Sequence, residues 1–335
     1  MPVNSVLVTG ATGFVGAELI RVLFASGVAP SQLRCLVRDA DRAVRGGVPP
    51  ECVRRGDLTD AASLRAAAAD VGLVFHLAGT LKGSRARDYH AVNAAGTRAL
   101  ALALRAQAPH CHVVLVSSLA AAGPSTDGAG TDLPPDRCAP VSAYGESKRQ
   151  GELALVQSGL SWTIVRPPVV YGPGDAATRL LFRQACAPLC AVPPRPRPLS
   201  VVHVTDVAAA LLAAGRVRPR GAVLPLDGPD RTDTHALLRA IAAACGRRAR
   251  LVPVPLALAA AAATLADAFC LLTRRASFFN GDKVKELRAP GWVADGSAAR
   301  RLLALPPAQT LADGLAAVAR AEGRSGHRPA RTSVS

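Results

Sequence analysis

The sequence predicts an α/β protein in which helices cover both faces of a doubly wound parallel sheet, with a smaller C-terminal lobe. Short β-branched runs alternate with segments of helical periodicity through the first half of the chain. These runs are almost wholly apolar, as expected of strands buried on both faces. Beyond about residue 175 the pattern becomes irregular and proline-rich, which indicates a second structural unit.

The elements of the sheet follow one another without an internal repeat. In the first helix, apolar residues recur at helical spacing and Gly27 is the expected stop. The expected strands of this first part are 5–10, 33–39, 72–79, 112–118 and 161–167. The expected helices are 17–27, 59–70, 93–108 and 142–159.

The domain organisation follows from where this alternation stops and resumes. Residues 1–175 form the sheet domain, and 199–227 are expected to return to it. Residues 176–198 and 228–322 are assigned to the smaller lobe, which would bind the substrate. The basic tail 323–335 has little hydrophobic content and is expected to be disordered.

Charge and cysteine usage exclude several classes of protein. The net charge is +16, but the basic residues are spread along the chain without a long block, so we expect no nucleic-acid binding. The eight cysteines are scattered without metal-ligand spacing, so no metal site is expected. Scattered thiols fit a reducing cytoplasm, and the first strand begins too early to leave room for a targeting segment.

The run 256–273 is almost wholly apolar and rich in alanine. Its 18 residues only reach the lower length limit of a membrane span, and Asp267 would be costly there. We therefore expect a buried helix of the C-terminal lobe. Peripheral membrane contact is the alternative, and a true span is the least favoured interpretation.

The segment between the first strand and the first helix has the character of a phosphate-binding loop. It reads GATGFVG, with glycines at Gly10, Gly13 and Gly16. Such glycines allow a tight turn and bring backbone N–H groups close to a pyrophosphate, to which the helix N-terminus adds its positive end. The spacing departs from the commoner G-x-G-x-x-G. Strand, loop and helix nevertheless follow in order, so we expect a dinucleotide site in a Rossmann-type sheet.

The second strand indicates which dinucleotide is bound. An acidic residue at its end would bind the ribose 2′-hydroxyl, and a basic residue would bind a 2′-phosphate. Arg38 closes this strand, and Asp39 follows directly. Arg38 favours NADP, with NAD as the alternative. Asp57, after the third strand, is placed either to accept from the adenine amine or to lie near the start of the next helix.

Tyr144 and Lys148 share one face of an expected helix in the segment AYGESK. A tyrosine with its usual pKa of about 10 is a poor base at neutral pH, and a nearby ammonium lowers that pKa. Lys148 is expected to do this and to bind the nicotinamide ribose. Ser118, at the end of an apolar strand, would hold the substrate oxygen, with Ser117 as the alternative. The set predicts proton transfer coupled to hydride transfer.

Six motifs occur at compatible spacing: GATGFVG, HLAG, NAAGT, SSLAAAG, YGESK and RPPVVYGPGD. With these motifs the chain resembles the extended short-chain dehydrogenase/reductase superfamily over about residues 4–325. This superfamily contains NAD(P)-dependent epimerases, dehydratases and 3β-hydroxysteroid or dihydroflavonol-type reductases. The resemblance implies an NAD(P)-dependent oxidoreductase.

The resemblance also implies roles for single residues. Ser118, Tyr144 and Lys148 match the catalytic residues of the superfamily, and Asn93 matches a polar residue that supports the site through hydrogen bonds. The residues expected to bind the cofactor are Gly10, Thr12, Gly13, Phe14, Val15, Gly16, Arg38, Asp57, Leu58, Leu77, Ala78, Gly79, Asn93, Tyr144, Lys148, Pro167 and Val170.

The substrate class rests on a departure from the superfamily. Many sugar-nucleotide members carry an Asn after the sixth strand that grips the diphosphate, whereas this stretch is VRPPVVYG, with Pro168 and no Asn. The departure, together with the apolar run 251–273, favours a lipophilic, sterol- or flavonoid-like alcohol or ketone. Arg179, Arg195 and Arg197 leave open an anionic sugar nucleotide, and with it an epimerase or dehydratase.

Two further interpretations stay open. One is a nucleotide-sensing or scaffold protein without catalysis, against which the intact Ser118, Tyr144 and Lys148 argue. The other is attachment to a membrane surface through residues 251–275. The expected partner is a small-molecule substrate, and the chain is compatible with a homodimer.

Overall fold

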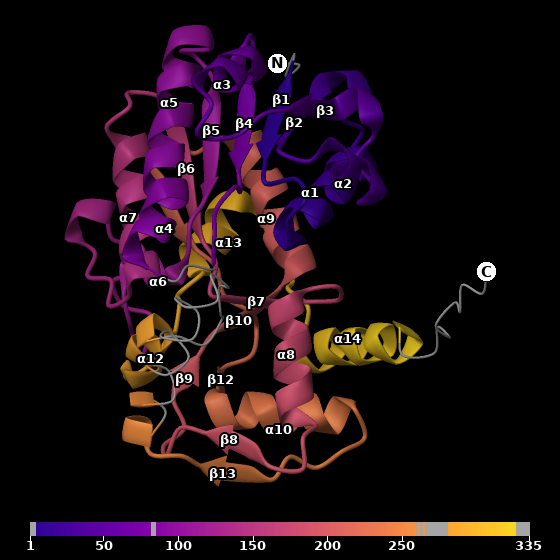
Figure 1. The fold of residues 1–335 in the computed structure, drawn as a ribbon, viewed down its shortest axis with the longest axis vertical. Helices are drawn as coiled ribbons and strands as arrows, with labels where there is room; N and C mark the ends of the chain where they lie inside the picture. The colour runs from indigo at the N-terminus through magenta and orange to yellow at the C-terminus, as the bar shows by residue number, and fades with distance from the viewer. Residues whose placement is uncertain (1–4, 82–84, 259, 262–263, 265–280, 326–335) are drawn as a thin grey trace.

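A computed structural model describes residues 5–81, 85–258, 260–261, 264 and 281–325. Its centre is a seven-stranded sheet in the order β11-β6-β5-β4-β1-β2-β3, in which every neighbouring pair is parallel. The strands are β1 (Val6–Thr9), β2 (Leu33–Val37), β3 (Val53–Arg55), β4 (Leu73–His76), β5 (His112–Val116), β6 (Ser161–Arg166) and β11 (Ala222–Pro225). The expected α/β fold class is confirmed (Figure 1).

Helices cover both faces of the sheet because each turns an apolar stripe towards the strands. One apolar core joins the sheet to helices α1 (Phe14–Ala25), α9 (Val204–Val217) and α13 (Ser297–Leu303). The core on the other face joins it to α3 (Ala61–Ala68), α5 (Gly96–Gln107) and α7 (Ala143–Val156). Four further short helices complete this part of the molecule: α2 (Ala40–Arg45), α4 (Ala86–Tyr89), α6 (Leu119–Ala122) and, from the lobe, α12 (Gly281–Arg288).

The segment 199–227 crosses from the lobe to the sheet. Strand β10 (Val201–His203) pairs with β7 (Val169–Tyr171) outside the main sheet, whereas β11 pairs with β6 within it. Helix α13 belongs to the stretch assigned from sequence to the lobe, yet Ala299 and Leu303 are buried in the core of the sheet domain.

The C-terminal lobe has its own core, at the bottom of Figure 1. It is built from α8 (Ala176–Ala185), α10 (Thr234–Ala244) and α14 (Leu311–Ser325), with the short strand pairs β8 (Cys190–Val192) with β13 (Leu251–Pro253) and β9 (Pro198–Leu199) with β12 (Thr232–Asp233). Helix α14 continues through Ser325, three residues into the expected tail.

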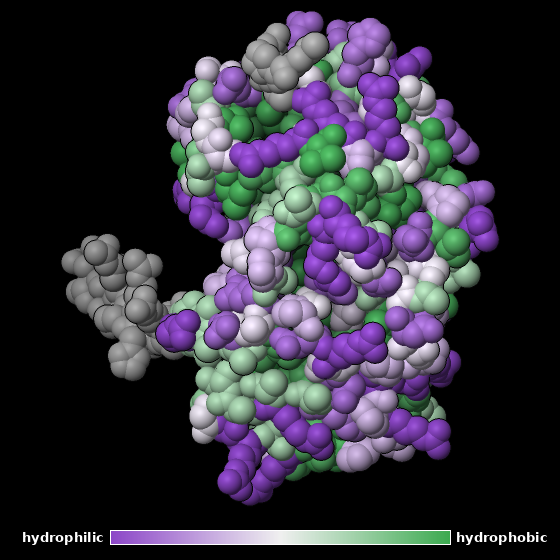
Figure 2. Space-filling model, turned by 180° about the vertical axis from the view of Figure 1, so that it is seen from behind, coloured by the Kyte–Doolittle hydropathy of each residue, from purple (hydrophilic) through white to green (hydrophobic). Residues whose placement is uncertain are grey.

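Several sequence-based expectations bear on the surface and the ends of the chain. Most of the apolar run 256–273 and the tail 326–335 lie outside the described residues. None of the described helices is long and apolar enough to cross a membrane. Seen from behind, hydrophilic residues are scattered over the whole visible face rather than gathered in one block (Figure 2).

The expected helix 93–108 begins differently from its prediction. Residues His90–Ala95 form a π-helical turn, and the regular helix α5 starts only at Gly96. Wider turns of this kind are rare and are often found at functional sites. Here the turn contains Asn93, one of the residues expected at the cofactor site.

Candidate active site

The glycine loop after β1 is packed too closely for larger residues. Gly10 has a φ of +75°, and a Cβ there would lie 2.6 Å from the backbone nitrogen of Ala78. A Cβ on Gly16 would run into the carbonyl of Gly10, to which the N–H of Gly13 donates at 2.9 Å. The glycines therefore let β1, the end of β4 and α1 meet at one point.

The start of α1 can receive an anion. Gly13 is the N-cap and supplies no side-chain cap, and the first turn contains no acidic residue. The first N–H groups of a helix lack intrahelical partners and carry its positive end. Thr12 and Gly13 are exposed beside these groups, with Phe14 and Val15 half-buried. The loop thus fits the pyrophosphate of a dinucleotide.

Residues 167–172 approach the same loop. A Cβ on Gly172 would lie 3.1 Å from the ring of Phe14. Val170 packs against the core that contains α1, and the carbonyl of Pro167 accepts from the N–H of Leu119 at 2.9 Å. The segment expected near the nicotinamide is therefore next to the glycine loop in space.

Arg38 and Asp57 meet at the carboxyl ends of β2 and β3. Their side chains are 3.8 Å apart, and Arg38 is largely exposed. The backbone N–H and hydroxyl of Thr59 donate to Asp57, and these bonds are the main reason that its pKa is lowered. The N-cap of α3 is Asp60, so Asp57 is not the capping residue. Leu58, the next residue, packs against α5, since a Cβ on Gly96 would lie 2.8 Å from its Cδ1.

A buried chain of hydrogen bonds runs from the end of β4 to Asn93. The N–H of Ala78 donates to the Thr9 hydroxyl at 3.2 Å, which lies 2.6 Å from Nδ1 of His76. Nε2 of His76 lies 2.9 Å from the hydroxyl of Thr97, which donates to the carbonyl of Asn93 at 2.7 Å. These partners hold His76 neutral, and burial lowers its pKa to about 3. His76 therefore links β1, β4 and α5 through its two ring nitrogens.

The Asn93 side chain ties three segments together. Its Oδ1 accepts from the N–H of Thr80 at 2.8 Å, and its Nδ2 donates to the Thr80 carbonyl at 3.2 Å and to the Ser147 hydroxyl at 2.9 Å. Gly79 lies against this side chain, because a Cβ there would be 3.0 Å from Oδ1 of Asn93. Leu77, two residues before Gly79, donates its N–H to the Thr9 carbonyl at 3.1 Å.

Tyr144 and Ser118 converge, although they come from different elements. Ser118 is the N-cap of α6, and its Oγ accepts from the N–H of Ala120 at 3.1 Å. A Cβ on Gly145, next to Tyr144, would run into the carbonyl of Ala120, so the start of α7 packs directly on α6. The Ser118 side chain acts to lower the pKa of the Tyr144 phenol, against the effect of burial. The ring of Tyr89 meets that of Tyr144 edge-on, with centroids 6.0 Å apart. Ser117, the alternative, has a buried hydroxyl with no hydrogen-bond partner in the described structure.

The side chain of Lys148 reaches the end of β5 and Gly79. Its Nζ donates to the Val116 carbonyl at 2.7 Å and lies 3.5 Å from the position of a Cβ on Gly79. Burial lowers the pKa of Lys148 to about 8. The pKa of Tyr144 is raised instead of lowered, mainly because burial disfavours the phenolate. The effect expected of Lys148 on the phenol therefore stays a prediction.

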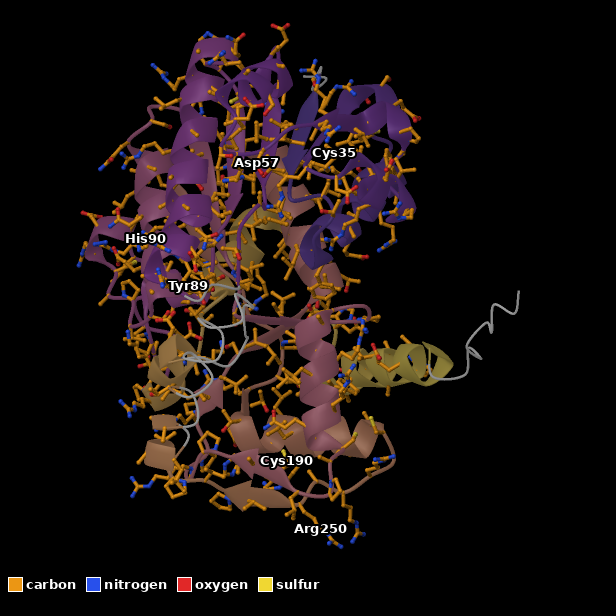
Figure 3. All side chains as sticks on the ribbon, in the orientation of Figure 1. Cys35, Asp57, Tyr89, His90, Cys190 and Arg250 are labelled. Carbon is orange, nitrogen blue, oxygen red and sulfur yellow. The ribbon has the colours of Figure 1, made fainter. Side chains whose placement is uncertain are left out.

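Two sets of residues beside the candidate site were not predicted from the sequence. Helix α12 brings Asp282 and Glu286 to the start of α7, and Tyr89 packs on Tyr144. Figure 3 labels Tyr89 near the junction of sheet domain and lobe, with Asp57 above it. These contacts join residues that are far apart in the chain, so no local sequence pattern predicts them.

A hollow of about 410 Å³ opens at the other end of the strands. It is lined by Arg105, Arg220 and Trp162, among others, beside the amino ends of β6 and β11. It therefore does not belong to the site around Tyr144. The described residues contain no cluster of His, Cys, Asp and Glu that could hold a metal ion.

Comparison with known proteins identifies the family of this chain. A family model described as the NAD dependent epimerase/dehydratase family matches residues 6–222. The chain belongs to this family. It is an NAD-dependent oxidoreductase of the extended short-chain type, as the motifs implied.

Relatives within and around this family differ in what they act on. A ceramide reductase from Caulobacter vibrioides is 35% identical over 293 residues, which cover 86% of this chain and 85% of that protein. Sterol demethylase protein B from Methylococcus capsulatus is 33% identical over 186 residues, covering 53% of this chain and 55% of that one. A structure of MoeE5 in complex with UDP-glucose and NAD has a TM-score of 0.72 at 25% identity, covering 96% and 99% of the two chains.

Proposed function

We propose that this enzyme reduces the ketone of a lipid-like substrate with NADPH, through Ser118, Tyr144 and Lys148. The observation that supports the proposal is the close packing of the start of α7 on α6, whose N-cap is Ser118, with the Nζ of Lys148 against Gly79. These residues lie just after β5, on α7 and just after β4, and ligands of open parallel sheets bind at the carboxyl ends of the strands.

Each of the three side chains has a separate task in this chemistry. The reduced nicotinamide supplies the hydride that the carbonyl carbon accepts. Tyr144 donates its phenolic proton to the carbonyl oxygen, which becomes the hydroxyl of the product. Ser118 donates a hydrogen bond to the same oxygen and holds it in place. Lys148, already beside Gly79, would hold the nicotinamide ribose through its Nζ.

The preference for NADPH rests on the end of β2. Asp39 is the residue that would bind an unphosphorylated ribose, but its Oδ1 accepts from the N–H of Arg42 at 2.9 Å as the cap of α2. Arg38 keeps a largely exposed guanidinium whose closest acidic neighbour is 3.8 Å away. An exposed guanidinium suits a 2′-phosphate, which it can bind through two hydrogen bonds.

The proposal of a lipid-like substrate rests on the relatives and on two arginines of the lobe, which already have partners. The relative that aligns over 86% of this chain is a ceramide reductase, and another is a sterol-modifying protein. The arginines that left a sugar nucleotide open are partly engaged. Arg179 pairs with Glu322 at 3.4 Å, and the Arg197 guanidinium donates to the Ala289 carbonyl.

Cofactor binding and net turnover test the proposal. Fluorescence titration should show tighter binding of NADPH than of NADH. The enzyme should then consume NADPH stoichiometrically with a long-chain N-acyl amino ketone or a 3-ketosteroid. Conversion of UDP-glucose without net loss of cofactor would instead establish a sugar-nucleotide epimerase.

Substitution of the catalytic tyrosine tests its role. Tyr144→Phe should slow ketone reduction by about 10²- to 10⁴-fold, the usual contribution of a general acid. NADPH affinity should change less than about threefold, because the phenol contacts the substrate oxygen. Unchanged turnover in this variant would remove Tyr144 from the mechanism.

A further inference from the structure

Helix α12 of the C-terminal lobe meets the first turn of the catalytic helix α7. Oδ1 of Asp282 accepts from the N–H of Ala143 at 2.6 Å, and Oδ2 accepts from the N–H of Tyr144 at 3.0 Å. One carboxylate thus holds two N–H groups that a helix N-terminus leaves without intrahelical partners. Because the second belongs to Tyr144 itself, Asp282 fixes the backbone that carries the phenol.

Glu286 lies one turn further along α12 and reaches the same helix end. Its Oε1 accepts from the Ser142 hydroxyl at 2.9 Å. Ser142 is the N-cap of α7, and its Oγ in turn accepts from the N–H of Gly145 at 3.0 Å. Two acidic side chains of the lobe therefore complete the cap of the catalytic helix.

Both carboxylates face α7, whereas their cationic neighbours face water. The side chains of Asp282 and Glu286 are 15% and 12% exposed. Lys285 and Lys283, which pair with them, are 61% and 55% exposed. A carboxylate that is largely removed from water acts more strongly on a nearby group than an exposed one does.

The groups around the phenol act on its proton in opposite directions. The Ser118 interaction favours the phenolate, whereas the charge of Glu286, the neighbouring Tyr89 and burial all raise the pKa of Tyr144. Lys148, on the same helix, directs its Nζ to the Val116 carbonyl. Two further acids lie at this helix end. Asp282 is bound to backbone N–H groups, and Glu146, in the first turn of α7, pairs with Arg149 and accepts from Gln150.

We propose that α12 is a positioning element in which Asp282 fixes the first turn of α7 and Glu286 holds its N-cap residue, Ser142, so that the Tyr144 phenol keeps its place. Tyr144 then stands ready as a proton donor, as carbonyl reduction requires. This inference rests on the proposed function. It makes a helix of the lobe a support of the catalytic helix, although α12 is not expected to touch the reacting atoms.

Substitution of Glu286 tests its role at the N-cap of α7. Glu286→Ala should lower kcat for ketone reduction several-fold, because Ser142 loses the carboxylate that accepts from its hydroxyl. Glu286→Gln, which keeps one acceptor oxygen, should recover part of that loss. Glu322→Gln, in α14, is the control and should leave reduction unchanged.

The split between kcat and KM gives the second readout. In folded Glu286→Ala the loss should appear in kcat, with KM for the ketone near its original value. If Glu286→Ala keeps full activity while Tyr144→Phe still abolishes reduction, the role of Glu286 is refuted. If Tyr144→Phe keeps its activity, the proposed function fails instead.

Asp282 is tested through position rather than charge. Asp282→Ala should lower kcat about tenfold with little change in KM. Asp282→Asn, which keeps one acceptor oxygen, should recover part of that loss, and thermal unfolding of both variants identifies any loss of fold. Full activity in folded Asp282→Ala would refute the positioning role, and so would a loss of activity that tracks only the loss of folded protein in both variants.

Discussion

Arg38 and Asp39 show how one residue's local bonds decide the role of its neighbour. From sequence Arg38 favoured NADP, and Asp39, directly after it at the end of the same strand, kept NAD as the alternative. In the structure Asp39 caps α2, which leaves the exposed guanidinium of Arg38 for a ligand. A cap is a local structure, but whether a helix begins at Asp39 depends on where the second strand ends.

Replacement of Arg38 tests the cofactor preference at this scale. In Arg38→Asp the Kd of NADPH should rise about ten- to hundredfold, because charge-assisted hydrogen bonds to the 2′-phosphate are lost. The Kd of NADH should change much less. Fluorescence titration measures both, and Arg65→Asp, an exposed site on α3, is the control. Equal changes for the two cofactors would contradict a 2′-phosphate contact.

Helix α7 shows what an element needs beyond its own pattern. Its start was predicted within one residue, and its Tyr144–Lys148 spacing defined the candidate site. Its anchoring was not predicted. Glu152 forms a fully buried pair with Arg166 of β6 at 2.7 Å, and Arg166 also donates to the carbonyls of Thr131 and Leu133. The pair connects α7, β6 and the loop after α6.

Breaking this pair should destabilise the whole sheet domain. Glu152→Gln leaves a buried guanidinium without its counter-charge, so the free energy of unfolding should fall by about 3–5 kcal/mol. Glu146→Gln, which affects a partly exposed pair with Arg149 on the same helix, should cost less than about 1 kcal/mol. Urea unfolding of both variants provides the comparison. Equal losses would show that the buried pair has no special weight.

At the scale of the whole molecule, two buried histidines link stability to pH. Burial lowers the pKa of His76 to about 3 and that of His112 to about 4. Both are below the value of about 6.5 expected in the unfolded chain, so the unfolded state binds more protons in between. Their contribution to stability is complete above that value and is lost as the pH falls towards 4 and then 3.

Chemical denaturation between pH 7 and pH 4.5 measures this effect. Each pH unit below about 6 should cost up to about 1.4 kcal/mol for each histidine. In His112→Gln the dependence on pH should be less steep by the share of one histidine, up to about 1.4 kcal/mol per pH unit. A variant with the full slope would mean that other groups cause the acid sensitivity.

The sequence by itself determined the alternation of strands and helices, the glycine loop and the Tyr144–Lys148 pair, and with them the family. Each of these depends on neighbours within a turn or a strand, where residue type and spacing decide the structure. Only the tertiary structure packed the start of α7 on α6, raised the pKa of Tyr144 and placed α12 at the start of α7. These depend on burial and on contacts such as that between Asp282 and Tyr144, 138 residues apart, which exist only once the lobe has packed against the sheet.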